Sequence, residues 1–289
     1  CAASVQKRLL VLLRSMRNEL RTVGFRPVYT ELGIGKGENG LPAYDLDCGN
    51  GIKARVTGSI DRVDALEKDG KTFVRVIDYK TGENKFSLAD ICRGKSLQLP
   101  LYLDILKETG AHLFSSEPEP AGMMYYVLNK ATEKLDTEPD TFAEFAQTGK
   151  LPAVPDSHKR SGMLLDVSSP TNGDEDGEQP DIHGEVDKKE FIKTDKNGFD
   201  TVFFYVKDSL KKMCGTLCSG RTEKTPNKNG NTCKYCPLGS ICEIRDNPPP
   251  ALKIDDPMKI MRDRMEKVIN ANRGEDKKNF ADKLAKGVL

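Results

Sequence analysis

The fold is decided by two stretches of the chain, GSIDR at residues 58–62 and IDYKTG at residues 77–82. Alternate residues of a β-strand point to the same face of a sheet, so Asp78 and Lys80 project together if the second stretch is a strand. Asp61 lies on the preceding predicted strand. A hairpin between the two strands would place Asp61 beside Asp78, and two carboxylates and one ammonium group would then meet at a strand end.

Period-two patterns and turn residues predict the elements around these stretches. Asp69-Gly70 is a favoured hairpin turn between the two strands. A helix follows them and leads back to an apolar strand, which indicates an α/β fold with a central mixed sheet and flanking helices. The predicted strands are residues 28–33, 44–47, 52–63, 73–79 and 123–128, and the predicted helices are residues 2–24, 88–109 and 199–218.

The cluster of two carboxylates and a lysine is the set that phosphodiester cleavage requires. A hard divalent cation such as Mg²⁺ or Mn²⁺ takes oxygen ligands, here Asp61, Asp78 and the backbone carbonyl of Tyr79. The cation generates a hydroxide nucleophile, and Lys80 can stabilise the charge that develops on the phosphate oxygens. Glu31 is a further candidate carboxylate. The alternative interpretation of an Asp-x-Lys pattern is a solvated salt bridge on an exposed strand.

Composition limits the classes of protein to consider. The chain has 289 residues, with 37% hydrophobic and 31% charged residues, as expected for a globular protein with a buried core. No stretch approaches the roughly 20 apolar residues of a membrane span. A net charge of +1 neither supports nor excludes DNA as a partner, because a local basic groove suffices for binding. The sequence lacks a G-x-x-x-x-G-K-[ST] phosphate loop, so an ATP site is not predicted.

Cysteines concentrate near the end of the chain, where five of the eight lie between Cys214 and Cys242. Without a secretory signal we expect a reducing compartment and thiols that are free or metal-bound. The spacing Cys233-x2-Cys236-x5-Cys242, with Pro and Gly inside the loop, is typical of a metal or iron–sulfur half-site. Cys214 and Cys218 could supply a missing thiolate, but their helix also carries Leu210, Met213 and Leu217. The favoured interpretation is therefore that both cysteines face the helix core.

The order of these motifs resembles the RecB-type PD-(D/E)XK nucleases. Glu31 is followed by GSIDRVD at residues 58–64, by Asp78-Tyr79-Lys80 and by QLPLY at residues 98–102. Gln98 and Tyr102 lie one helical turn apart, as in the family's Q-x-x-x-Y motif. The resemblance implies a restriction-endonuclease-like core in which these two residues help to hold DNA or the catalytic residues.

The cysteine spacing resembles the AddB subfamily, whose corresponding motif ligates a [4Fe–4S] cluster together with a fourth, upstream Cys. Residues 159–165 and the stretch that leads into Cys233 are also similar. The resemblance implies an exonuclease that acts on 5′-ended single-stranded DNA in double-strand-break repair, with an AddA-like helicase–nuclease subunit, in the bacterial cytoplasm. The chain departs from the family because no His precedes Glu31 and because Cys1 is the only candidate for the upstream Cys. It is therefore expected to be a fragment.

The expected organisation is an N-terminal helix at residues 1–25 and a nuclease core at residues 26–231, with a loop insertion at about residues 155–195. A cysteine knuckle at residues 232–246 and a helical tail at residues 247–289 follow. One alternative is a DNA-binding module without catalysis, in which the knuckle is a structural zinc site. Iron and sulfide would favour the nuclease, and stoichiometric zinc the module. Another is a free-standing RecB-like nuclease without a helicase partner.

Overall fold

The computed structural model describes most of the chain in two compact units. The described residues are 13, 16–17, 19–21, 23–37, 39–49, 51–82, 85–127, 160–166, 182–183, 189–221, 237–238 and 253–285. The first unit comprises residues 1–44, 55–87 and 96–203, and the second comprises residues 45–54, 88–95 and 204–289. The candidate active site lies wholly in the first unit.

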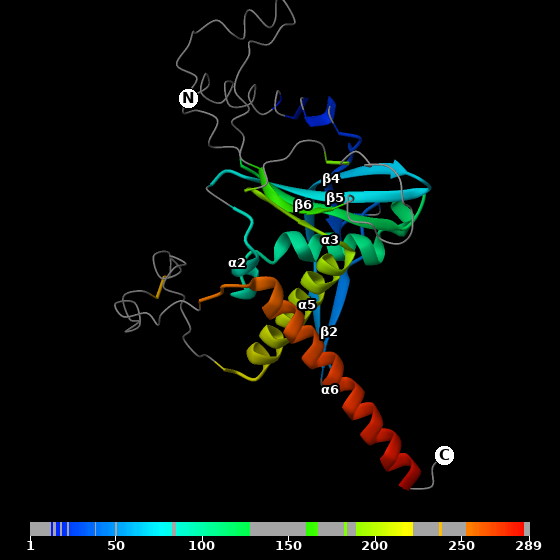
Figure 1. Ribbon diagram of the computed structural model, residues 1–289, viewed down its shortest axis with the longest axis vertical. Coiled ribbons are helices and arrows are strands. Elements are labelled where there is room, and N and C mark those ends of the chain that lie inside the picture. The colour runs from blue at the N-terminus through cyan, green and yellow to red at the C-terminus, as the bar shows by residue number, and fades with distance from the viewer. Residues whose placement is uncertain are drawn as a thin grey trace, which may run out of the picture. The chain divides into compact units, whose positions relative to one another are not determined.

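A six-stranded mixed sheet forms the centre of the first unit (Figure 1). The strand order is β1-β4-β5-β6-β7-β8, with parallel pairing between β5 and β6 and between β7 and β8, and antiparallel pairing elsewhere. The strands are β1 (Arg26–Ile34), β4 (Gly58–Lys68), β5 (Lys71–Lys80), β6 (Pro118–Val127), β7 (Arg160–Leu165) and β8 (Phe191–Thr194). The predicted α/β class with a mixed central sheet is confirmed.

The hairpin between β4 and β5 fixes the position of the candidate site. Asp69 and Gly70 both have positive φ, at 52° and 72°, as a two-residue type I′ turn requires. The register then runs from Lys68 opposite Lys71 to Arg62 opposite Ile77. The predicted hairpin is confirmed.

The segment between β5 and β6 contains two helices where the sequence predicted one at residues 88–109. These are α2 (Leu88–Cys92) and α3 (Gln98–Thr109), and a 3₁₀ turn, η1 (Ala111–Leu113), follows. Gly94 and Ser96 have positive φ, at 75° and 52°, so the helix cannot continue through them. Helix α3 packs on β5 and β6 and completes the crossover that their parallel pairing requires.

Two other predictions for this part of the chain were wrong at their boundaries. The predicted strand 52–63 is divided at Thr57 into β3 (Ile52–Val56), which pairs with β2 (Tyr44–Gly49), and β4. The predicted loop insertion at about residues 155–195 contains β7 and β8, which belong to the central sheet. Both strands are short and acquire their structure by pairing with a neighbour, an effect that local sequence does not reveal.

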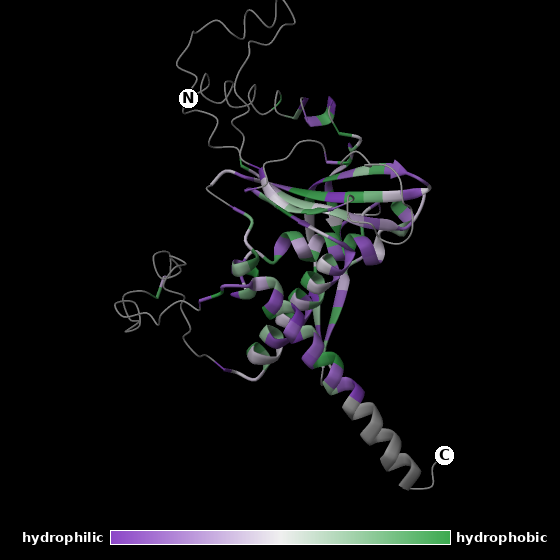
Figure 2. Cartoon of the chain, viewed as in Figure 1, coloured by the Kyte–Doolittle hydropathy of each residue, from purple (hydrophilic) through white to green (hydrophobic). Residues whose placement is uncertain are grey.

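The core of the sheet is apolar, with hydrophilic residues inserted at β4 and β5, as purple segments in Figure 2 show. Ile77, Met124, Tyr126, Leu164 and Phe191 form a buried cluster. Met16 packs against the same cluster, and residues 16–17 and 19–21 are helical, whereas most of the predicted N-terminal helix lies outside the described residues. Helix α3 thus packs on one face of the sheet, and Met16 packs on the other.

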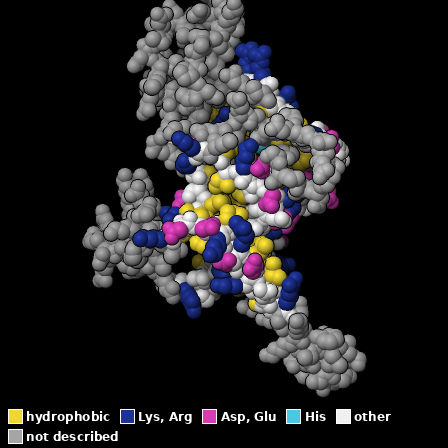
Figure 3. Space-filling view, viewed as in Figure 1, with side chains coloured by type: hydrophobic (Ala, Val, Ile, Leu, Met, Phe, Trp, Pro, Cys, Tyr) yellow, Lys and Arg dark blue, Asp and Glu magenta, His cyan; other side chains and the backbone are white. Residues whose placement is uncertain are grey.

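The second unit contains most of helix α5 (Lys196–Cys218), together with α2 and α6 (Pro257–Ala285). Figure 3 shows Lys and Arg side chains interspersed with Asp and Glu on the face in view, as the net charge of +1 suggests. None of the helices among the described residues combines the length and apolar character that a membrane crossing requires.

Candidate active site

Asp61 and Asp78 lie on the paired strands β4 and β5, one residue beyond the last register pair, Arg62 opposite Ile77. Asp78 is 4% exposed, and its Oδ2 atom lies 2.6 Å from Lys80 Nζ. The Oδ2 atom of Asp61 accepts a hydrogen bond from the backbone N–H of Tyr79 at 2.9 Å. The structure therefore brings together the two carboxylates and the lysine that the sequence singled out.

The electrostatic environment of Asp78 disfavours its charge. Burial raises the pKa of its carboxyl group, the ion pair with Lys80 opposes this rise, and the charge of Asp61 adds to it. The net result is a pKa above the ordinary value for an aspartate. The carboxylate of Asp78 is desolvated and lies near that of Asp61. The ammonium group of Lys80 offsets only part of the energetic cost of the charge on Asp78. Such an arrangement is typical of a functional site.

Gln98 and Tyr102, the two residues of the Q-x-x-x-Y motif, lie on the first turns of α3. Gln98 is close to the end of β5, and Tyr102 is close to the start of β4. Gln98 accepts a hydrogen bond from Lys80 Nζ through Oε1 at 3.4 Å. The hydroxyl group of Tyr102 packs against the Cα atom of Gly58, so that a Cβ atom there would lie 2.5 Å from it. Gly58 thus permits the close approach of α3 to the start of β4. Lys80 Nζ also lies 5.6 Å from the ring centroid of Tyr125.

Glu31 lies on β1, and the register that pairs Thr30 with Arg62 and Leu32 with Ile60 places it opposite Asp61 of β4. Its side chain is exposed, and its Oε2 atom accepts a hydrogen bond from Ser59 Oγ at 3.1 Å. Its backbone adopts a positive φ of 51°, which is strained for a residue with a side chain. Within the described part of the chain, no three His, Cys, Asp or Glu side chains form a group that could hold a metal ion. A direct part for Glu31 in the site stays a prediction from the sequence.

The metal ligands expected from the sequence are the two carboxylates and the backbone carbonyl group of Tyr79. Their donor atoms are all oxygen, which fits a hard divalent cation such as Mg²⁺ or Mn²⁺. The raised pKa of Asp78 fits the same ligand, because a cation between the carboxylates would remove the repulsion that contributes to the rise. The residues present are thus compatible with a divalent cation at Asp61, Asp78 and Tyr79.

The residues behind the site were not predicted from the sequence. Arg62, Asp64 and Arg75 alternate with the active-site residues along β4 and β5 and are almost completely buried, at 2%, 0% and 1% exposure. They hydrogen-bond to one another on the opposite face of the sheet. The signal was present in the GSIDRVD stretch, where charged residues occupy both faces of a strand that the fold buries.

The predicted cofactor ligands Cys233, Cys236 and Cys242 lie outside the described residues. The interpretation that Cys214 and Cys218 face a helix core was wrong for Cys218, which is exposed, whereas Cys214 is half-buried. Both lie on the terminal turns of α5, where Met213 is 44% and Leu217 is 78% exposed. Hydrogen bonding to the Cys48 thiol, with smaller effects of burial and of Cys218, raises the pKa of Cys214 to about 11.

Comparisons with known proteins extend these observations. Residues 2–243 match the family model described as the PD-(D/E)XK nuclease superfamily. The chain is 29% identical over 216 residues to an ATP-dependent helicase/deoxyribonuclease subunit of Clostridium kluyveri (strain NBRC 12016), a match that covers 71% of this chain and 18% of that protein. It is 30% identical over 219 residues to the corresponding helicase/deoxyribonuclease subunit of Thermoanaerobacter sp. (strain X514), with coverage of 73% and 19%. The chain thus spans about a fifth of the length of these relatives.

Proposed function

Because this chain belongs to the PD-(D/E)XK nuclease superfamily, we propose that Asp61, Asp78 and Lys80 form the active site of a metal-dependent nuclease that hydrolyses DNA. The observation that carries the proposal is the buried carboxylate of Asp78, held beside Asp61 and 2.6 Å from Lys80 Nζ. A carboxylate kept in a place that raises its pKa destabilises the fold when it is ionised, so its presence needs a functional reason.

Asp61, Asp78 and the carbonyl group of Tyr79 are the proposed ligands for Mg²⁺ or Mn²⁺. A bound cation would neutralise phosphate charge and lower the pKa of a water molecule, which supplies the hydroxide nucleophile. The protein's part is to present the oxygen atoms in fixed positions. The hydrogen bond from the Tyr79 N–H to Asp61 Oδ2 restricts the rotation of that carboxylate, and the ion pair with Lys80 restricts that of Asp78.

Lys80 is proposed to stabilise the negative charge that develops on the phosphate oxygens as the bond to the leaving oxygen breaks. Its ammonium group is held between Asp78 and the Oε1 atom of Gln98. Gln98 therefore positions Lys80, which is a physical reason for the first residue of the Q-x-x-x-Y motif. Tyr102, whose hydroxyl group packs against Gly58, is proposed to hold the start of β4 and to contact DNA.

The relatives named as helicase/deoxyribonuclease subunits support a more specific proposal. The chain would be the exonuclease domain of a helicase–nuclease that processes double-strand breaks in the bacterial cytoplasm. It would receive unwound, 5′-ended single-stranded DNA and work with an AddA-like subunit. In the same proposal, Cys233, Cys236 and Cys242 ligate a [4Fe–4S] cluster, and iron and sulfide analysis of the purified protein tests this part separately.

The test is cleavage of end-labelled single-stranded DNA by this chain in the presence of Mn²⁺, with Asp78→Ala and Lys80→Ala as variants. Loss of an electrostatic stabiliser at an active site lowers rates by about 10²–10³-fold, which is the decrease expected for each variant. Asp200→Asn and Lys71→Ala are matched controls, because both remove an exposed charge elsewhere in the first unit.

Cleavage that is lost in both variants and retained in both controls, with DNA binding unchanged, would support the proposal. Equal cleavage by the parent and both variants would exclude Asp78 and Lys80 from the active site. A parent that binds single-stranded DNA but does not cut it would favour the alternative of a DNA-binding module.

A further inference from the structure

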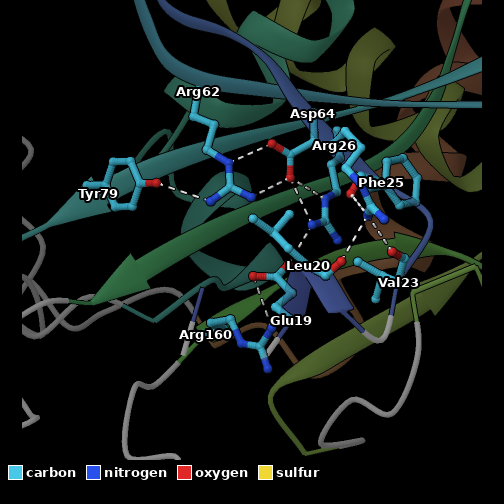
Figure 4. Close-up of polar contacts among 10 residues, drawn as sticks. Glu19, Leu20, Val23, Phe25, Arg26, Arg62, Asp64, Tyr79 and Arg160 are labelled. Carbon is cyan, nitrogen blue, oxygen red and sulfur yellow. Dashed lines mark hydrogen bonds and ion pairs between the residues drawn. The ribbon is translucent and has the colours of Figure 1, made fainter. Parts of the chain in front are cut away.

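Behind the proposed active site, Arg62 makes three hydrogen bonds in a buried position. Its Nε and Nη2 atoms donate to the two carboxylate oxygens of Asp64 at 2.6 and 2.7 Å, and its Nη1 atom donates to the hydroxyl oxygen of Tyr79 at 3.2 Å (Figure 4). Burial opposes the charge of the guanidinium group, but the hydrogen bonds and the charge of Asp64, assisted by Tyr79, raise the pKa of Arg62 above its ordinary value. Arg62 therefore remains a charged donor.

Asp64 is held in turn by a second arginine. Arg75 donates to Asp64 Oδ2 from Nε at 2.9 Å and to Glu19 Oε1 from Nη2 at 2.5 Å. Its guanidinium group also lies 4.6 Å from the ring centroid of Phe25, and Arg160 lies 3.4 Å from Glu19 Oε2. Figure 4 shows the hydrogen bonds and ion pairs as one connected network that joins β4 and β5 to Glu19 of the N-terminal segment and Arg160 of β7. Because each charge has several partners, the network holds the Arg62 guanidinium group in one place.

Tyr79 connects this network to the active site. Its side chain points to the face that carries Arg62, where the phenol ring lies 5.8 Å from that of Tyr126. Its backbone N–H lies at the site and donates to Asp61 Oδ2. Asp78 and Lys80 are its two neighbours in the chain. Fixing the phenol hydroxyl group therefore restricts the backbone at the residue that separates the two catalytic groups.

We propose that Arg62 is a positioning residue of the active site, and that it acts through the hydroxyl group of Tyr79 to fix the backbone of that residue and the carboxylate of Asp61. Its catalytic consequence rests on the proposed nuclease function. A salt bridge that served stability alone would be complete with the two bonds to Asp64. The third bond, to Tyr79, is the one that reaches the site.

The first test is amide hydrogen exchange of the metal-free chain, in which the exchange rate at residue 79 is compared between the parent and Tyr79→Phe. The variant removes only the hydroxyl group and keeps the ring packing. Loss of one hydrogen bond predicts exchange that is faster by up to about tenfold at residue 79, with Val74 and Val76 of β5 unchanged. Tyr29→Phe is the matched control, because it removes a hydroxyl group that donates to the Leu113 carbonyl oxygen at 2.8 Å.

The second variant, Arg62→Lys, keeps a positive charge near Asp64 but cannot donate to both Asp64 oxygens and Tyr79 at once. The double variant combines Arg62→Lys with Tyr79→Phe. If the bond from Arg62 to the Tyr79 hydroxyl group slows exchange at residue 79, the rate in the double variant will not exceed that in Arg62→Lys alone, because both substitutions remove the same interaction. An unchanged rate at residue 79 in Tyr79→Phe overturns the proposal. Independent, multiplicative effects of the two substitutions overturn it as well.

The third measurement links positioning to function. Calorimetric titration with Mn²⁺ is expected to show affinity several-fold weaker in Tyr79→Phe than in the parent or in Tyr29→Phe, with unchanged affinity for single-stranded DNA. Equal Mn²⁺ affinity in all three proteins contradicts the inference that the contact serves the metal ligands. A parent that does not bind Mn²⁺ contradicts the proposed function instead, while the exchange experiment still decides whether Arg62 fixes residue 79.

Discussion

The two faces of strands β4 and β5 differ in how completely the charges of their side chains are balanced by partners of opposite charge. On one face, the carboxylate of Asp78 lies near that of Asp61 and pairs with Lys80, and the pKa of Asp78 is raised. On the other face, Asp64 accepts hydrogen bonds from Arg62 and Arg75, and all three are buried. The incompletely compensated face has the character of a binding site for a cation, and the compensated face has the character of a scaffold.

This difference shows how one strand can serve two purposes. Because alternate residues point to opposite faces, GSIDRVD places its charged residues in two separate environments within a single stretch. Buried charges are tolerated on the scaffold face only because their partners are complete. Incomplete compensation on the other face, the proposed functional face with Asp61, Asp78 and Lys80, is consistent with the proposed nuclease site. Substitutions that change one face at a time test this distinction.

The largest effect is expected for Asp64→Asn on the compensated face. The substitution leaves the buried guanidinium groups of Arg62 and Arg75 without their shared counter-charge, and removal of one partner from a buried ion pair lowers the free energy of unfolding by about 3–5 kcal/mol. Urea denaturation of the purified chain measures the change. The matched control is Asp200→Asn, which breaks an exposed ion pair of the same length, 2.6 Å, with Lys107.

The exposed pair should contribute at most about 1 kcal/mol to the free energy of unfolding. Equal destabilisation by Asp64→Asn and Asp200→Asn would mean that the buried network does not hold the sheet together, and the division into a scaffold face and a functional face would fail.

The next effect is smaller and has the opposite sign. Asp78→Asn is expected to raise the free energy of unfolding by about 1 kcal/mol at pH 8, because it removes a carboxylate whose charge the fold disfavours. The pKa of Asp78 in the folded chain lies above its value in the unfolded chain, so ionisation favours unfolding as the pH rises through that interval. The stabilisation should therefore be full at pH 8 and should disappear as the pH falls below about 4.

Denaturation curves at pH 8, 6 and 4 measure this dependence. Asp200→Asn is again the control, since its carboxylate is half exposed. Destabilisation by Asp78→Asn at pH 8 would indicate that the ion pair with Lys80 outweighs the cost of burial, and the functional face would then be as well compensated as the scaffold face.

Local sequence was sufficient to predict that Asp61, Asp78 and Lys80 come together on one face. The alternation of Asp78 and Lys80 depends only on strand geometry, and the turn at Asp69-Gly70 set the register that brings Asp61 alongside. The spacing of Gln98 and Tyr102 placed both on one face of a helix. Each of these inferences involves residues whose relation is fixed by one element or one tight turn, which is why they could be made without a structure.

The scaffold face could not be predicted in the same way. Glu19 is 56 residues from Arg75 in the chain, and Arg160 lies much further along. Which of many charged residues will pair across such separations depends on the order of strands in the sheet, and β7 was not recognised as a strand. The sequence indicated that charges lay on both faces of β4, but their partners come from tertiary structure.

The smallest effect is expected for Glu31, which lies opposite Asp61 on the neighbouring strand β1 but has an exposed side chain. The sequence suggested it as a further carboxylate of the site, and its exposed side chain is bonded to Ser59. Water screens an exposed charge, so Glu31→Gln should lower DNA cleavage by no more than about fivefold, the equivalent of 1 kcal/mol. Asp61→Asn, on the adjacent strand, should lower it by about 10²–10³-fold. Equal losses in the two variants would extend the functional face across β1 and give Glu31 a direct part in catalysis, for which its strained backbone would then have a reason.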